Sequence, residues 1–286
     1  MAKSNISLST RIPLNNGTSI PQFGFGVWKL GSNDETKAAV LIALEAGYRH
    51  FDAAAAYRNE AGVGDAIRES GIPRQEIFLT TKLANIHQRE GRQQHGFERS
   101  MAALKLDYID LYLEHWPVPS RYRETWKLME GWLRQGLVRA IGVSNFRTSH
   151  LKDLMQDALI LPAANQIEHN PGMQDNETIA FCREHGIAVE ASSPLGRGNI
   201  AGNPAIDAIG ASYGKTGAQA VLRWILQRGI VVFPKSAHRE RIFENADIFD
   251  FELSEEDCRR FEAMNAGAYT GNNPDDPSTY IYRELD

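Results

Sequence analysis

The sequence has 286 residues, of which 42% are hydrophobic and 23% are charged. These values are ordinary for a globular protein with a large buried core, and an α/β barrel commonly reaches about 250 residues as one domain. The formal net charge of -5 gives no overall basic surface for nucleic acid or an anionic membrane. We therefore expect a single domain over residues 1–286, with neither nucleic acid nor a membrane as a partner.

The first residues lead into a polar alternating stretch that lacks the apolar core of a signal peptide. No apolar run approaches the roughly 18 residues of a membrane-spanning helix. Cys182 and Cys258 lie in segments with the pattern of amphipathic helices, without C-x-x-C spacing or a histidine at metal-binding spacing. We expect free thiols in a reducing compartment, and hence a cytoplasmic protein. We also expect the protein to be capable of acting as a monomer.

Polar and apolar residues alternate over residues 6–22 around Asn15, Asn16 and Gly17, which predicts a small hairpin with a turn of positive φ. Beyond it, short apolar runs alternate with helical patterns. The predicted strands cover residues 22–28, 48–53, 77–83, 109–114, 138–143, 163–167, 187–191 and 230–233. The predicted helices cover residues 33–46, 59–70, 91–104, 123–135, 148–157, 175–185, parts of 204–227, 239–246 and 254–264.

Strands that alternate with helices over short connections predict an α/β fold, here a (β/α)8 TIM barrel, because parallel strands need crossover helices. A doubly wound open sheet is the alternative. The tail over residues 266–286 is rich in Gly, Asn, Pro and Asp and contains Tyr269, Tyr280 and Tyr282. We expect an N-terminal β-hairpin before the barrel and an irregular C-terminal tail over one of its mouths.

Four polar side chains follow or end predicted strands: Asp52, Tyr57, Lys82 and His115. In a barrel of this kind they converge on one face. Each has an ordinary structural explanation when taken alone, as a turn former, a solvated cation, a core phenol or a packed imidazole. Together they point to a site, because Lys82 and His115 follow apolar strands, where a buried ionisable group needs a partner.

The motifs around these residues resemble those of the aldo-keto reductases, over residues 6–265. The motifs cover Asp52 to Tyr57, residues 80–83, 113–117, 141–146 and 165–168, and residues 233–245. Within that family the sequence is most similar to short-loop prokaryotic members such as 2,5-diketo-D-gluconate reductase. The resemblance implies an oxidoreductase that passes a hydride from NADPH to an aldehyde or ketone. It also implies that Tyr57 is the general acid, that Lys82 and Asp52 support it, and that His115 orients the carbonyl.

Elementary chemistry agrees with these roles. Hydride addition builds negative charge on the carbonyl oxygen, so a proton donor must meet it there. A free phenol, with a pKa of about 10, is a weak acid. An ammonium about 4 Å away contributes on the order of 4 kcal/mol at an effective dielectric constant of about 20, before desolvation opposes it. We therefore expect Lys82 to move the pKa of Tyr57 toward neutrality, and Asp52 to keep Lys82 charged.

No G-x-G-x-x-G follows a first strand, so the sequence gives no support for a Rossmann dinucleotide site. The resemblance instead implies NADPH-binding roles, with Ser144, Asn145 and Gln166 at the carboxamide and Leu195 and Gly196 along the pyrophosphate. Lys235, Ser236 and Arg241 would surround the 2′-phosphate, which predicts NADPH over NADH. The full implied set is Gly26, Val27, Trp28, Ser144, Asn145, Gln166, Ser192, Leu195, Gly196, Lys235, Ser236, Arg241, Glu244 and Asn245, with Glu244 and Asn245 at the adenine.

Three positions depart from the family pattern. Ser192 stands where an aromatic residue usually stacks on the nicotinamide, which should weaken binding by about 0.5–1.5 kcal/mol. Ala84 stands where a Trp is common, which predicts a more open substrate wall beside Trp28 and Trp116. Arg58 replaces a frequent Gly and either is solvated or meets an acidic substrate.

Two other functions remain open on the sequence alone. The first is a regulatory or sensor protein on the same fold that binds NADPH with little turnover. The second is an unrelated metal-dependent barrel, although the histidines show no clustered ligand spacing, so we expect no metal.

Overall fold

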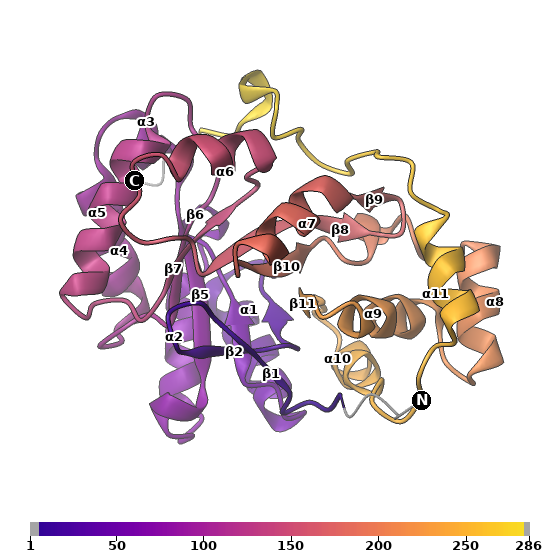
Figure 1. Cartoon of the computed structure of the whole chain (residues 1–286). Helices are drawn as coiled ribbons and strands as arrows, with labels where there is room; N and C mark the ends of the chain where they lie inside the picture. The colour runs from indigo at the N-terminus through magenta and orange to yellow at the C-terminus, as the bar shows by residue number, and fades with distance from the viewer. Residues whose placement is uncertain (1–5, 283–286) are drawn as a thin grey trace.

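The computed structural model describes residues 6–282 (Figure 1). A small antiparallel hairpin comes first, formed by β1 (Arg11–Pro13) and β2 (Ser19–Pro21), with Arg11 opposite Pro21. Gly17 lies in its turn with a φ of +84°, a conformation that favours glycine. The predicted hairpin and its turn are therefore confirmed.

Eight parallel strands form the barrel, and each is hydrogen-bonded to the next in chain order. They are β3 (Phe25–Gly26), β4 (His50–Asp52), β5 (Phe78–Leu83), β6 (Leu111–Glu114), β7 (Ile141–Ser144), β8 (Ala164–Asn170), β10 (Ala188–Ser192) and β11 (Val231–Val232). The two ends of this sheet meet where Phe23 pairs with Val232, whose backbone N–H donates to the Gln22 carbonyl at 2.9 Å. The predicted (β/α)8 barrel is confirmed, and an open doubly wound sheet is excluded.

A helix follows each barrel strand and lies outside the sheet (Figure 1). These helices are α1 (Asn33–Glu45), α2 (Glu60–Glu69), α4 (Gln93–Leu104), α5 (Tyr122–Arg134), α6 (Thr148–Leu154), α7 (Asn176–Glu184), α9 (Gly217–Gln227) and α10 (Arg239–Ala246). Three more are α3 (Asn85–Arg89), α8 (Pro204–Ser212) and α11 (Glu255–Glu262). The predicted start of α11 is confirmed, because the Ser254 hydroxyl accepts a hydrogen bond from the Asp257 backbone at 3.1 Å.

The remaining elements are short. They are the 3-10 turns η1 (Ala55–Tyr57), η2 (Arg74–Glu76), η3 (Gly196–Gly198) and η4 (Pro277–Thr279), and β9 (Met173–Gln174), which pairs antiparallel with β8. The sequence patterns missed α3 and β9. Five residues and two residues are too few to display a helical or a strand period.

The hairpin closes the N-terminal mouth of the barrel. Leu14 and Ile20 from this hairpin join a buried cluster with interior residues such as Phe78, Leu111 and Phe233. A second, larger cluster fills the layer between the strands and the helices. Because the N-terminal mouth is plugged by apolar side chains, the C-terminal ends of the strands are left as the place for a site.

The tail crosses the C-terminal mouth (Figure 1, yellow). It starts beside β8, where the Thr270 backbone N–H donates to Glu168 Oε1 at 2.8 Å. It ends beside α3, where Asn85 Nδ2 donates to the Ile281 carbonyl at 3.2 Å. The expectation that the tail covers one mouth is therefore confirmed for residues 266–282.

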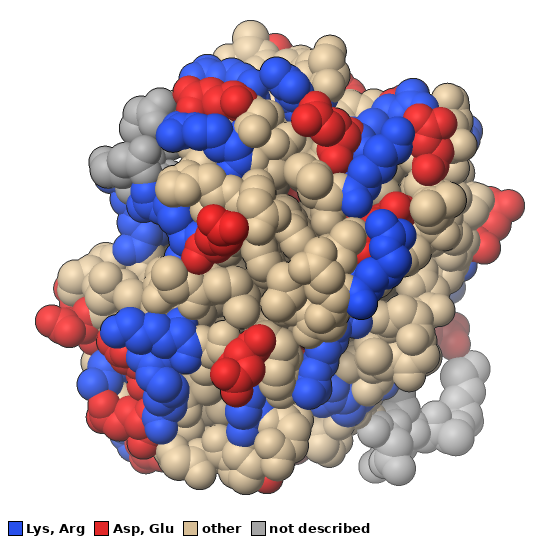
Figure 2. All heavy atoms as spheres, turned by 90° about the vertical axis from the view of Figure 1, so that its left-hand side faces the viewer, with Lys and Arg blue, Asp and Glu red and all other residues tan. Residues whose placement is uncertain are grey.

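Charges of both signs are interspersed on the face shown in Figure 2, around a broad uncharged area. This distribution agrees with the expected lack of a single large basic surface, at least on this face. Over residues 6–282, the helices are too short or too polar to span a lipid bilayer.

Candidate active site

The four candidate catalytic residues lie at the C-terminal ends of three neighbouring strands. Asp52 ends β4 and Tyr57 ends η1, which follows within a few residues; Lys82 lies in β5, and His115 directly follows β6. Asp52 is paired with Thr80 and Lys82 with Leu113 in the sheet register. The sheet therefore brings the four side chains to one region of the mouth.

Lys82 is the centre of this group. Its Nζ donates to Asp52 Oδ1 at 2.7 Å, to Asp52 Oδ2 at 2.8 Å, to the Ala53 carbonyl at 2.9 Å and to the Tyr57 hydroxyl at 3.4 Å. The Lys82 side chain is 0% exposed, so its charge depends on these partners. Burial lowers the pKa of Lys82, but Asp52 and then Tyr57 raise it more, and the ammonium stays charged.

Tyr57 corrects one sequence-based expectation. Burial raises the pKa of the Tyr57 phenol, and this effect outweighs the lowering by the Lys82 charge, so the pKa lies above its usual value. The expected net shift toward neutrality is wrong because sequence spacing shows the nearby cation but not the loss of solvent. Tyr57 is thus held as a neutral phenol, and Lys82 is placed to stabilise the phenolate that forms when the proton leaves.

His115 packs edge-on against Tyr57, with ring centroids 5.8 Å apart. Burial, and then the Lys82 charge, lower the pKa of His115 to about 3, so the imidazole is neutral. Its backbone carbonyl accepts a hydrogen bond from Asn145 Nδ2 at 2.8 Å.

The exposed Arg58 has a φ of +61°, which gives a physical reason for glycine to be favoured at this position.

The predicted carboxamide-binding residues lie on the next strands. Ser144 ends β7 and receives a hydrogen bond from Asn145 Nδ2 at 3.1 Å. Gln166 in β8 donates through Nε2 to Asp52 Oδ1 at 2.8 Å and to Glu190 Oε2 at 3.0 Å. Ser192 ends β10 and is half-buried. The amide of Gln166 is thereby joined directly to the Lys82–Asp52 pair.

Loops at the mouth hold other predicted cofactor residues. The Gly26 backbone N–H donates to the Pro234 carbonyl at 3.1 Å, and the Val27 N–H donates to the Asp52 carbonyl at 3.1 Å. Leu195 and Gly196 follow β10, and Gly196 has a φ of +56°. Gly196 lines a cavity together with the tail residues Tyr269 and Thr270.

A cluster of cations lies where β11 leads into α10. Burial lowers the pKa of Lys235, and repulsion from Arg241 and then Lys29 lowers it further. The described residues provide no ion-pair partner for any of the three. Ser236 is buried beside them, with its hydroxyl accepting from the His238 N–H at 3.0 Å. A cluster of cations without acidic partners can bind an anion. The cluster therefore agrees with the prediction that the 2′-phosphate of NADPH binds here.

The sequence reasoning did not include Lys29 among the candidate phosphate-binding residues. The sequence offered an indication, because Lys29 is a cation that follows Trp28 shortly after β3, at a strand end like the other candidates. Glu244, in contrast, is already used in the fold: its Oε1 accepts from the Thr216 hydroxyl at 3.0 Å, and its carbonyl accepts from Gln219 Nε2 at 2.9 Å. Asn245 beside it is buried.

Aromatic side chains form the rest of the mouth. The Trp28 ring lies 4.4 Å from Lys29 Nζ and 4.7 Å from the Arg197 guanidinium, and the Trp116 ring lies 4.8 Å from the Tyr280 ring. Ala84 is buried with Ala55 and Ile86, and Tyr282 packs on this cluster. The cluster around Ala84 thus includes a contact with a tail residue about 200 positions away, which local sequence could not show.

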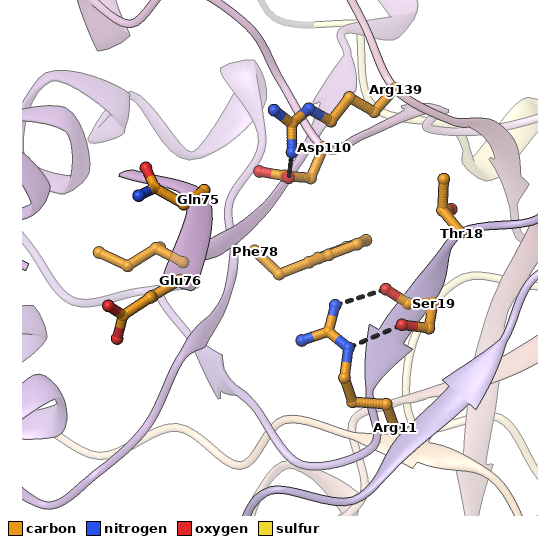
Figure 3. A pocket seen from close by; sticks show the side chains of 9 residues that line it. Arg11, Thr18, Ser19, Gln75, Glu76, Phe78, Asp110 and Arg139 are labelled. Atoms are coloured by element: carbon orange, nitrogen blue, oxygen red, sulfur yellow. Dashed lines mark hydrogen bonds and ion pairs between the residues drawn. The ribbon is translucent and has the colours of Figure 1, made fainter. Parts of the chain in front are cut away.

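A cavity also exists at the opposite mouth, between the hairpin and the start of β5 (Figure 3). Its charged residues are mostly used within the protein. Asp110 accepts from Arg74 at 2.7 Å and lies 3.8 Å from Arg139, while Arg11 donates to the Ser19 hydroxyl at 2.8 Å. The Asp52, Tyr57, Lys82 and His115 side chains lie at the other end, and we place the candidate site there.

The fold and the site define a class: a (β/α)8 barrel with a buried lysine–carboxylate pair in contact with a phenol, and a cluster of cations where β11 leads into α10. The Aldo/keto reductase family model matches residues 22–266, and the chain belongs to this family.

Comparison with individual proteins gives the same result. The chain is 45% identical over 270 residues to glyoxal reductase of Bacillus subtilis (strain 168), covering 94% of this chain and 98% of that protein. It is 43% identical to methylglyoxal reductase DkgA of Escherichia coli O157:H7, covering 93% and 97%. The crystal structure of a Bombyx mori aldo-keto reductase in complex with NADP is similar with a TM-score of 0.88 and 36% identity, over 97% of this chain and 99% of that one.

Proposed function

We propose that this protein is an NADPH-dependent reductase of small aldehydes or ketones, with Tyr57 as the proton donor. The observation that carries the proposal is the contact series in which Asp52 holds Lys82 and Lys82 donates to the Tyr57 hydroxyl. Support also comes from the family, since relatives are named glyoxal reductase and methylglyoxal reductase and a structural neighbour is complexed with NADP.

The cation cluster gives the reason to prefer NADPH over NADH. Lys29, Lys235 and Arg241 gather positive charge that the described residues leave without an ion-pair partner. A phosphate dianion would relieve their mutual repulsion and accept hydrogen bonds from them. When bound, the cofactor supplies the hydride; the protein residues bind it, orient it and manage the proton.

The proton step is assigned to Tyr57. As the carbonyl carbon gains the hydride, negative charge grows on its oxygen, and the Tyr57 hydroxyl gives its proton to that oxygen to complete the alcohol. The phenolate that remains lies beside the Lys82 ammonium, and a proton from solvent later restores the phenol. His115, held neutral, donates an N–H to the same oxygen and thereby orients the carbonyl.

The test is NADPH consumption by the purified protein against glyoxal, methylglyoxal, aldoses, keto-sugars, aryl aldehydes and bulky ketones. We expect turnover with at least one class, and a loss of about 10²–10⁴-fold in kcat for Tyr57→Phe. Tyr213→Phe is the matched control, because its hydroxyl lies at the start of α11, where it donates to Asp257 at 2.7 Å and accepts from the Ser254 backbone N–H at 2.9 Å. Near wild-type kcat in Tyr57→Phe would remove Tyr57 as the donor.

The second candidate function is a regulatory or sensor protein that binds NADPH with little turnover. The departure at Ser192 favours it, since the usual aromatic stack is absent. Tight NADPH binding with no consumption across the whole carbonyl panel would support this function over the reductase.

We infer that the protein acts as a monomer, which sedimentation velocity tests directly.

A further inference from the structure

Glu190 is a buried carboxyl group at the centre of the barrel that the proposed reaction does not use. It lies in β10, two residues before Ser192, and is 0% exposed. Its Oε2 accepts a hydrogen bond from Gln166, while its Oε1 has no hydrogen-bond partner among the described residues. Burying a carboxyl group that is only half satisfied is unfavourable, so this residue requires an explanation beyond packing.

The geometry around Gln166 supplies the first part of that explanation. Its Nε2 carries two hydrogens, and they are directed to Asp52 Oδ1 at 2.8 Å and to Glu190 Oε2 at 3.0 Å. Both amide hydrogens are therefore used inside the protein. The carbonyl oxygen is left to accept from a ligand, and an amide N–H is the group that it would select.

Charge supplies the second part. The charged groups that face Glu190 are Asp52 from β4 and Lys82 from β5, and the neighbouring β11 contributes the uncharged Val231 and Val232. Burial, and then Asp52, raise the pKa of Glu190 to about 7, against smaller opposite effects of Gln166 and Lys82. Its proton is thus gained and lost near neutral pH, next to a lysine that supports Tyr57.

We propose that Glu190 is a positioning residue: it fixes the Gln166 amide with its carbonyl toward the cofactor carboxamide, and its ionisation sets the net charge beneath Tyr57. The inference rests on the proposed function. With Glu190 protonated, Asp52 and Lys82 form a neutral pair, and phenolate formation is supported. With Glu190 ionised, the buried group has a charge of -1 and opposes a second negative charge on Tyr57. Carbonyl reduction therefore slows as pH rises and Glu190 loses its proton.

Two substitutions separate the two parts of the proposal. Glu190→Gln keeps a hydrogen-bond acceptor of the same shape and removes the ionisation. Glu190→Leu removes both. Glu130→Gln is the matched control, because Glu130 is also buried but lies in α5, where its Oε1 accepts from the Leu159 and Ile160 backbone at 2.7 and 2.9 Å.

The measurement is kcat/KM for one reducible carbonyl from about pH 5.5 to about pH 8.5, with the dissociation constant of NADPH from tryptophan fluorescence. We expect a several-fold fall through about pH 7 in wild type and in Glu130→Gln, and no such fall in Glu190→Gln. We expect Glu190→Leu to bind NADPH about three- to tenfold more weakly, and Glu190→Gln to bind it nearly as wild type does.

A wild-type pH profile in Glu190→Gln, or the same altered profile in Glu130→Gln, would overturn the charge role. Unchanged NADPH affinity in Glu190→Leu would overturn the orienting role. If that variant does not fold, Glu190→Met, which removes the same carboxyl group and keeps an unbranched side chain, replaces it in the binding measurement with the same weakening expected. If wild type has no turnover, the proposed function fails separately, while the fluorescence titration and the infrared carboxyl band of Glu190 across the pH range still decide this inference.

Discussion

Lys82 donates to both carboxylate oxygens of Asp52, at 2.7 and 2.8 Å, inside a barrel where the lysine has no exposed surface. The candidate site depends on this ion pair, because the buried Lys82 ammonium that supports Tyr57 stays charged only while the Asp52 carboxylate is present. Removing one member of a buried ion pair leaves the other uncompensated and is destabilising by about 3–5 kcal/mol.

Asp52→Asn should therefore lower both activity and stability. The lysine would lose the strongest support for its charge, and we expect kcat to fall by about 10²-fold or more, with a loss of roughly 3 kcal/mol in unfolding free energy. Steady-state kinetics and urea denaturation measure the two effects. Asp65→Asn is the control, since it breaks an exposed ion pair with Arg68 and should change stability by less than about 1 kcal/mol. Unchanged activity in Asp52→Asn would contradict the assignment.

Lys235→Met and Arg241→Met should each weaken the binding of NADPH and leave the binding of NADH nearly unchanged. The reason is that these cations are assigned to the one phosphate that distinguishes the two cofactors. A lost charge-assisted hydrogen bond of about 1.5–3 kcal/mol corresponds to roughly 10–100-fold in the KM for NADPH. Arg239→Met, in the same helix as Arg241 but paired with Glu45, should change neither KM. Equal effects on both cofactors would show that the cluster does not read the 2′-phosphate.

Ser192→Trp should tighten NADPH binding. Ser192 ends β10 and is half-buried at the mouth, where the resemblance implies that the nicotinamide ring lies. An aromatic side chain there could stack on the ring, with a gain of about 0.5–1.5 kcal/mol. Equilibrium titration of NADPH against wild type and variant measures the gain. Weaker binding by a variant that folds normally would mean that the space beside Ser192 is occupied by protein.

Some features of the candidate site could be predicted from the sequence and others could not. The convergence of Asp52, Tyr57, Lys82 and His115 could be predicted because strand ends follow from hydrophobic periodicity and because barrel topology places them on one face. The sign of the Tyr57 pKa shift was missed because burial depends on all surrounding elements. The packing of Tyr282 on the cluster of Ala55, Ala84 and Ile86 and the buried pairing of Gln166 with Glu190 depend on contacts between distant segments, and no local pattern records them.

Glu114, the residue before His115, offers a test of burial energetics through protein stability. It lies in β6, is 0% exposed, and neither carboxyl oxygen has a hydrogen-bond partner among the described residues. Burial raises its pKa well above the usual range in the folded state. Below the unfolded-state pKa of about 4.3, the group is protonated in both states and has no pH-dependent effect. Above it, the unfolded chain ionises first, so Glu114 lowers stability progressively as pH rises.

Glu114→Leu should therefore stabilise the protein at neutral pH by about 1–3 kcal/mol, the usual cost of burying a polar group without a hydrogen bond, and the gain should grow as pH rises above the unfolded-state pKa. Near pH 4 only the part of the gain that comes from the apolar side chain should remain. Urea denaturation at about pH 4, 6 and 8 measures the difference between variant and wild type. Glu256→Leu, at an exposed position of α11, should give a difference that does not grow with pH. A gain at Glu114 that is equal at all three pH values would mean that this carboxyl group is hydrated in solution.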